Sequence, residues 1–80
     1  MNFKDVKELA YALKLKIDEF ISKDINREDL KIYIKEIISV KDHRNMIYRQ
    51  DGYAVTINRV LGDKRLPLFT EILNEINSKH

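Results

Sequence analysis

Most of the arginines in this sequence lie in one segment, residues 41–65, which also holds both glycines. Four of the five arginines are there, and the six basic and three acidic side chains of the segment give it a net charge of +3. A guanidinium group binds a phosphate through two parallel hydrogen bonds, and a tyrosine ring stacks on a base. The residue types therefore suit contact with nucleic acid or another anion, through Arg44, Arg49, Arg59, Lys64 and Arg65, with Tyr48 and Tyr53 among them.

A simpler explanation of the same segment weighs more heavily. Asp42, Asp51 and Asp63 dilute its positive charge, and a net of +3 over this length is modest. Charged surface residues mostly serve solubility. The arginines are then solvated or paired within the chain, and the sequence leaves open whether the basic side chains form one surface.

Residues capable of nucleophilic catalysis are sparse. Ser39 and His43 are four residues apart and could share a helix face. A working triad also needs an acidic residue that orients the histidine ring, and none is evidently placed to do so. Such a pair often arises by chance, so a solvated helix end is the better interpretation.

Acidic pairs and metal ligands give no stronger signal. The neighbours Asp18 and Glu19, like Glu28 and Asp29, point about 100° apart on a helix, so neither pair forms a site by itself. The chain has no cysteine, only two histidines and no glycine-rich phosphate loop. We predict a protein that is not an enzyme and has no metal, no cofactor and no small-molecule substrate.

The first expected element is an amphipathic helix from Phe3 to about Lys23. Its apolar residues form one stripe about 120° wide, which is a helical period and not a strand period. Tyr11 and Leu15 lie together on the opposite face, as a ridge that hints at a second contact surface. The conservative explanation is that both are merely exposed or touch another helix of the chain. The apolar stripe consists of Phe3, Val6, Leu9, Ala10, Leu13, Ile17, Phe20 and Ile21.

A second helix is expected from about Arg27 to Lys41. Asn26 is a good N-cap, and Asp29 stands in the capping-box position three residues later. The short link before Asn26 favours an antiparallel pair with the first helix. Its inward-facing residues are expected to be Leu30, Tyr33, Ile34, Ile37 and Ile38.

Residues 42–62 are ambiguous. We favour an irregular segment to about Gln50, followed by a short third helix from Asp51 or Gly52 to Leu61, with Gly62 ending it. Its inward face would hold Tyr53, Ile57, Val60 and Leu61. The alternative is a short hairpin around Asp51-Gly52, because Asp-Gly between apolar runs is a strong hairpin signal.

A last helix is expected from about Lys64 to Asn77. Pro67 fits a helix only in its first turn, so the helix should start no earlier than Asp63 or Lys64. Its buried residues would be Leu66, Phe69, Ile72, Leu73 and Ile76. Residues 1–80 are thus predicted to form a single all-α, four-helix domain, with an α+β domain as the alternative if the hairpin forms.

The stretch Val60-Leu61-Gly62-Asp63-Lys64-Arg65-Leu66 has a familiar pattern, with Tyr53-Ala54-Val55-Thr56-Ile57 before it and Leu68-Phe69 after it. These residues resemble a family of small uncharacterised proteins from low-GC Gram-positive bacteria. The family's pattern contains a Leu-Gly-Lys-Lys-Arg-Leu-like stretch, from which Asp63 and Pro67 depart. The resemblance implies an all-helical fold and brings no activity.

The function predicted from these observations is a non-enzymatic protein–protein interaction or regulatory module that associates with itself, as a dimer for example, or with another protein. Phe3, Tyr11 and Leu15 are the expected interface residues. Nucleic-acid binding through the Arg44–Arg65 segment is the alternative. No apolar run approaches the roughly 20 residues that cross a bilayer, and the first residues lack the apolar core of a signal peptide. A cytoplasmic protein with no membrane contact is expected.

Overall fold

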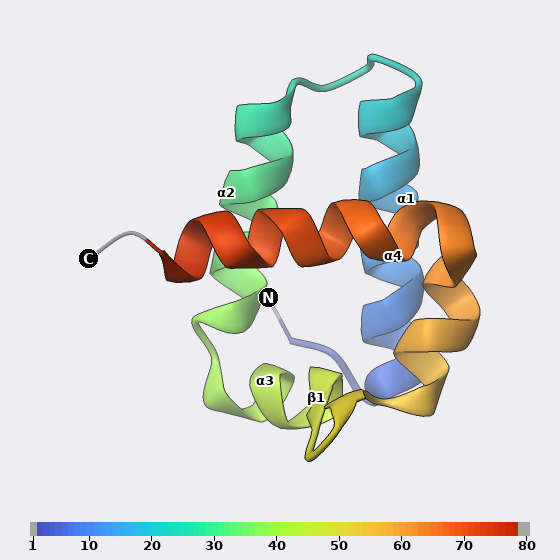
Figure 1. The fold of residues 1–80 in the computed structure, drawn as a ribbon, viewed down its shortest axis with the longest axis vertical. Helices are drawn as coiled ribbons and strands as arrows, with labels where there is room; N and C mark the ends of the chain where they lie inside the picture. The colour runs from blue at the N-terminus through green and yellow to red at the C-terminus, as the bar shows by residue number, and fades with distance from the viewer. Residues whose placement is uncertain (1, 79–80) are drawn as a thin grey trace.

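Four helices and one hairpin account for most of residues 2–78, the part of the chain that the computed structural model describes (Figure 1). The two strands have two residues each. The predicted all-α, four-helix class is therefore confirmed. In chain order the elements are α1 Val6–Ile21, α2 Arg27–Ile38, α3 Lys41–Ile47, β1 Tyr48–Arg49, β2 Gly52–Tyr53 and α4 Val55–Asn77.

Helices α1 and α2 form the predicted antiparallel pair (Figure 1). α1 starts at Val6, not Phe3, because the Asp5 side chain caps it by accepting the Glu8 N–H at 2.9 Å. At the start of α2 the predicted capping box is complete. Asn26 Oδ1 accepts the Asp29 N–H at 2.8 Å, and the Asp29 carboxylate accepts the Asn26 N–H at 3.3 Å.

The predicted end of the second helix is wrong by about one turn. The sequence predicts a helix to Lys41, whereas α2 ends at Ile38 and Val40 is extended, with φ −98° and ψ 123°. The chain then enters α3, in a region where the sequence predicts irregular structure.

Side chains of α3 bind the last carbonyl groups of α2, which explains the break. A ring nitrogen of His43, Nδ1, lies 2.9 Å from the carbonyl oxygen of Ile37, and Arg44 donates to the carbonyl of Ile38 at 2.7 Å. The final carbonyls of a helix lack partners within it, so these contacts compensate for ending α2 early.

The predicted start of the third helix at Asp51 or Gly52 is also wrong, because that helix begins at Val55 and the alternative hairpin is present before it in a minimal form. Tyr48 pairs with Tyr53 and Arg49 with Gly52, so Gln50 and Asp51 occupy the turn instead of Asp51-Gly52. The hairpin lies against α4, because the Tyr53 hydroxyl is 2.7 Å from Thr70 Oγ1 and its ring is 5.6 Å from that of Phe69. A two-stranded ribbon needs such support to be stable.

The third and fourth predicted helices are two parts of α4, separated by a kink at Gly62. Gly62 has φ 69° and ψ −177°, a conformation that is essentially restricted to glycine. The predicted interruption at this residue is therefore correct, and so is a restart no earlier than Asp63. After the kink α4 turns and crosses in front of α1 and α2 (Figure 1).

All four helices contribute to one apolar core. The predicted inward residues are buried or packed at its edge, with one exception: Ile21, in the last turn of α1, is 55% exposed because it lies at the edge of the stripe beside the loop. The fully covered core consists of Leu9, Ala10, Leu13, Ile17, Leu30, Ile34, Ile37, Ile47, Ala54, Ile57, Leu61, Phe69, Ile72 and Leu73.

Candidate interaction surfaces

Tyr11 and Leu15 form an exposed apolar ridge on α1, hereafter the α1 ridge. Their exposed fractions are 46% and 64%. Seven large apolar side chains are exposed within residues 2–78. Among these seven, Tyr11 and Leu15 are the one pair that lies four residues apart on the same helix. The Lys14 ammonium lies 5.8 Å from the centre of the Tyr11 ring, so a positive charge borders the ridge.

Phe3 lies elsewhere, although the sequence groups it with the α1 ridge as a possible interface residue. Its ring packs 5.0 Å from that of His43, and it is partly buried against the core. Phe3 therefore holds the segment before α1 in place and adds little to an outer surface.

Arg65 is bound within the chain. Its Nε and Nη2 atoms donate to the two carboxylate oxygens of Asp18 at 2.7 and 3.2 Å, and Nη1 donates to the carbonyl of Leu61 at 3.3 Å. The hydrogen bonds with Asp18 raise the pKa of Arg65, against a smaller effect of burial. This bidentate pair joins α4 to α1 just after the kink, so Arg65 is not free for phosphate.

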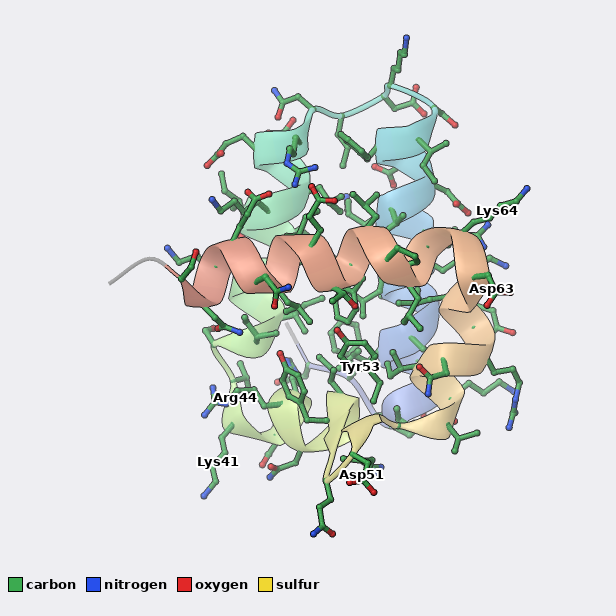
Figure 2. The ribbon with its side chains drawn as sticks, in the orientation of Figure 1. Lys41, Arg44, Asp51, Tyr53, Asp63 and Lys64 are labelled. Atoms are coloured by element: carbon green, nitrogen blue, oxygen red, sulfur yellow. The ribbon has the colours of Figure 1, made fainter. Side chains whose placement is uncertain are left out.

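The other four predicted basic residues are exposed, and they are not gathered together. Arg44 and Lys64 lie at opposite sides of the molecule in Figure 2. Arg49 donates to the carbonyls of Asn45 and Tyr48, at 2.7 and 2.8 Å, while keeping its charge at the surface. The positive segment of the sequence is thus distributed over at least two sides of the fold, with Arg59 on the first part of α4.

The two tyrosines of that segment are engaged in the fold. The Tyr53 ring, which belongs to β2, packs against the Phe69 ring of α4. The centre of the Tyr48 ring lies 6.0 Å from the centre of the Tyr53 ring. Partial burial, together with the nearby Tyr53 hydroxyl, raises the pKa of Tyr48. Tyr53 is therefore no open platform for stacking on a base, whereas Tyr48 remains 36% exposed.

Ser39 and His43 point to different backbone partners. The Ser39 hydroxyl donates to the carbonyl of Glu36 at 2.6 Å, and His43, which is only 2% exposed, lies against the carbonyl of Ile37. Their positions are those of structural side chains at the junction of α2 and α3.

The acidic residues are also distributed. Glu19 pairs with the Lys16 ammonium at 3.4 Å, and Asp18 pairs with Arg65. Within residues 2–78 no three His, Asp or Glu side chains gather in a way that could hold a metal ion.

An ion-pair network clamps the second part of α4 to α2. Arg27 donates to Glu71 at 2.9 Å and to Glu75, and the Lys31 ammonium lies 3.6 Å from Glu75. The hydrogen bond from Arg27 lowers the pKa of Glu75, and the same bond raises the pKa of Arg27. The contact depends on residues more than forty positions apart, which sequence patterns do not reveal.

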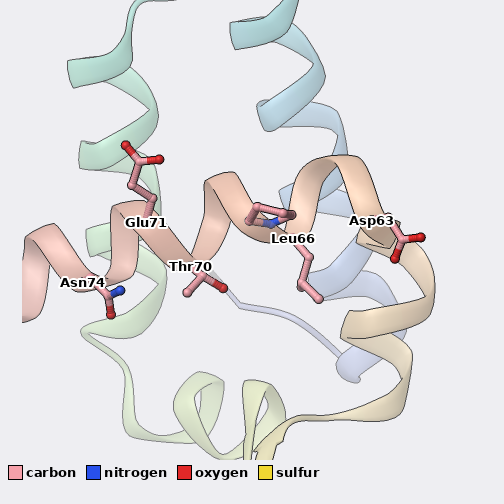
Figure 3. A pocket seen from close by; sticks show the side chains of 6 residues that line it. Asp63, Leu66, Thr70, Glu71 and Asn74 are labelled. Atoms are coloured by element: carbon pink, nitrogen blue, oxygen red, sulfur yellow. The ribbon is translucent and has the colours of Figure 1, made fainter.

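A shallow groove of about 530 Å³ runs along the outer face of α4, hereafter the α4 groove (Figure 3). Leu66 and Pro67 are its apolar lining residues, and Asp63 and Glu71 are its acidic ones. The helical period of the sequence does not reveal this groove, because it places Leu66 on the buried face of the helix, and Leu66 lines the groove while also packing at the edge of the core. Pro67, one turn into a helix, is the residue of the sequence that could have indicated a surface feature at this place. Thr70 and Asn74 complete the lining.

No helix within residues 2–78 combines the length and the apolar character needed to cross a bilayer.

Comparison with protein families matches residues 1–74 to a family described as conserved hypothetical proteins. The chain belongs to this family. The family match extends from the start of the chain into the last turns of α4, so it includes the α1 ridge, the α4 groove and all five basic residues. This match agrees with the predicted resemblance in that the family is an uncharacterised one. No significant match was found among curated proteins or among solved structures.

Proposed function

We propose that this protein is a non-enzymatic interaction module that associates with itself through the α1 ridge. The supporting observation is the exposure of Tyr11 and Leu15, two large apolar side chains one helical turn apart on a small domain. Contiguous exposed apolar surface is a common mark of a protein-binding site. Aromatic residues such as Tyr11 are also enriched at the centres of interfaces.

The expected association is weak. Stable protein complexes bury about 800 Å² on each partner, which is several times more than two side chains supply. Neighbouring residues must therefore contribute, and we expect a reversible equilibrium that depends on protein concentration.

A matched pair of variants tests the proposal. Leu15→Arg puts a charge on the α1 ridge, and Ile32→Arg puts the same charge on a 47% exposed apolar residue of α2. Both positions are in the middle of a helix and outside the core, so both chains should fold. Light scattering after gel filtration should show association of the wild type and of Ile32→Arg, but not of Leu15→Arg. Equal loss in both variants would contradict a role specific to the α1 ridge.

Nucleic-acid binding is the second candidate, and the observation in its favour is that four of the five basic side chains remain exposed. Arg59 and Lys64, both on α4 and without an ion pair or side-chain hydrogen bond within residues 2–78, are the cations best placed to contact phosphate. Binding through them should weaken steeply with salt, because phosphate contacts release counterions. Fluorescence anisotropy with short duplex and single-stranded probes tests this. Binding that Arg59→Glu with Lys64→Glu leaves unchanged would eliminate the candidate.

The proposal includes a cytoplasmic location in a low-GC bacterium. The many Lys, Ile and Asn residues fit such a genome, and a chain without cysteine needs no oxidising compartment for its stability. Fractionation of cells that express the tagged protein would test the location.

A further inference from the structure

Resting on the proposed self-association, we infer that the α1 ridge of one copy binds the α4 groove of a second copy, in a head-to-tail contact. The ridge consists of two projecting apolar side chains, and the shallow groove has Leu66 and Pro67 in its lining. The groove is long enough to take the ridge, since Asp63 to Asn74 covers about 16 Å of helix and Tyr11 to Leu15 about 6 Å.

The charges around the two surfaces are complementary. On α1 two acidic neighbours of the ridge are paired with cations, since Asp18 binds Arg65 and Glu19 binds Lys16. Glu8 accepts only the backbone N–H of Lys4 and keeps its negative charge. Lys7 is exposed, and the Lys14 ammonium borders the Tyr11 ring. Two lysines against one carboxylate leave a positive balance beside the ridge.

The α4 groove offers the opposite sign. Asp63 is exposed at one end of the groove, with no cation bound to it within residues 2–78. Glu71 accepts from Arg27 through Oε1, yet its side chain remains 64% exposed and can accept a second cation. Lysines beside the ridge and carboxylates beside the groove would add electrostatic attraction to the apolar contact and make it sensitive to salt.

The two surfaces face away from each other on one molecule. α1 and α4 pack against each other, with Leu13 and Ile17 of α1 and Phe69 and Ile72 of α4 buried in the shared core. The ridge and the groove lie on the exposed faces of these helices, away from the buried residues. A copy therefore cannot use both surfaces on the same partner. A contact of this kind forms open chains or rings and not a closed dimer.

Mixing of two variants tests the inference. Leu15→Arg disables the ridge and keeps the groove, whereas Pro67→Arg fills the groove with a positive charge and keeps the ridge. Each variant alone should associate at least about tenfold more weakly than the wild type, which corresponds to loss of one central contact. An equimolar mixture should recover a 1:1 heterodimer that stops at two chains, seen by sedimentation velocity. Val55→Arg, at a 69% exposed apolar residue of α4 outside the groove, is the control and should behave as the wild type.

The outcomes separate this inference from the proposed function. If Pro67→Arg associates as strongly as the wild type while Leu15→Arg does not, the ridge binds something other than the groove, and only the head-to-tail contact is overturned. If the wild type remains monomeric at every concentration, both fail. Recovery in the mixture also excludes misfolding as the cause of the single losses, because an unfolded chain would not restore binding.

Discussion

Replacement of Gly62 by alanine is the sharpest test of how the fold places the α4 groove. Gly62 has φ 69° and ψ −177°, a conformation that an L residue adopts only under strain. A Cβ atom built at this position meets no other atom within 4 Å. The cost of the substitution is therefore a backbone cost, with no contribution from a steric clash.

The expected magnitude follows from two opposing effects. Backbone strain of this kind costs about 1–3 kcal/mol. Replacing glycine by alanine also lowers the entropy of the unfolded chain, which stabilises the fold by about 0.4–1 kcal/mol. For Gly62→Ala the two effects together leave a loss of free energy of unfolding between about 0 and 2.6 kcal/mol, centred on about 1.3 kcal/mol. In a domain of this size each kcal/mol lowers the melting temperature by about 4–8 °C.

D-alanine at position 62 is the matched control, and a chain of 80 residues is within reach of chemical synthesis. For a D residue the same backbone angles are the mirror image of an extended conformation that L residues adopt freely. This variant should keep the entropic gain without the strain, so it should be at least as stable as the wild type. Urea unfolding followed by far-UV circular dichroism measures both variants.

The reasoning would be refuted if L-alanine and D-alanine had the same effect. A Gly62→Ala variant more stable than the wild type would mean that α4 runs straight through Gly62. The groove after the kink would then lie elsewhere on the domain.

Three further predictions concern the contacts that hold the elements together. Arg27 lowers the pKa of Glu75 in the folded protein. The ion pair therefore stabilises the fold above the ordinary carboxyl pKa of 4.5, and this contribution is lost as the pH falls through the lower folded value. The difference in urea midpoint between the wild type and Glu75→Gln should thus be largest near neutral pH and vanish in acid. His43→Ala removes a buried ring and its hydrogen bond to the carbonyl of Ile37, so it should lower the free energy of unfolding by about 2–3 kcal/mol. Thermal unfolding measures the change. An unchanged melting temperature would mean that the α2–α3 junction does not depend on this side chain. Asn26→Ala breaks the capping box and should cost about 1 kcal/mol, with Asn26→Asp as the conservative control that restores most of it.

The parts of the fold that were predictable depend on local signals. The helical period of residues 6–21, the reciprocal cap of Asn26 and Asp29, and the interruption at Gly62 all act over a few residues. The exposure of Tyr11 and Leu15 follows from the same period, because residues on the face opposite the apolar stripe must point outward.

Residues 41–54 could not be assigned in this way, because distant contacts determine their structure. α3 depends on the bonds of His43 and Arg44 to the end of α2, and the hairpin depends on the contact of Tyr53 with Thr70. For a short apolar run with both helical and strand character, such contacts outweigh intrinsic propensity.

The candidate surfaces also depend partly on local sequence signals and partly on contacts between distant residues. A basic segment is visible in the sequence, but the pairing of Arg65 with Asp18, 47 residues away, decides that this arginine is not a free anion ligand. The α4 groove arises from the kink at Gly62 together with the exposure of Pro67, and it becomes visible only once α4 is placed on the core.

Sedimentation velocity of the wild-type protein over a wide concentration range tests the proposed self-association most directly. The mass of one chain is 9.5 kDa. We predict that the average mass rises steadily with concentration and passes that of a dimer, and that added salt reverses the rise. A mass that stays at 9.5 kDa at every concentration would contradict the account.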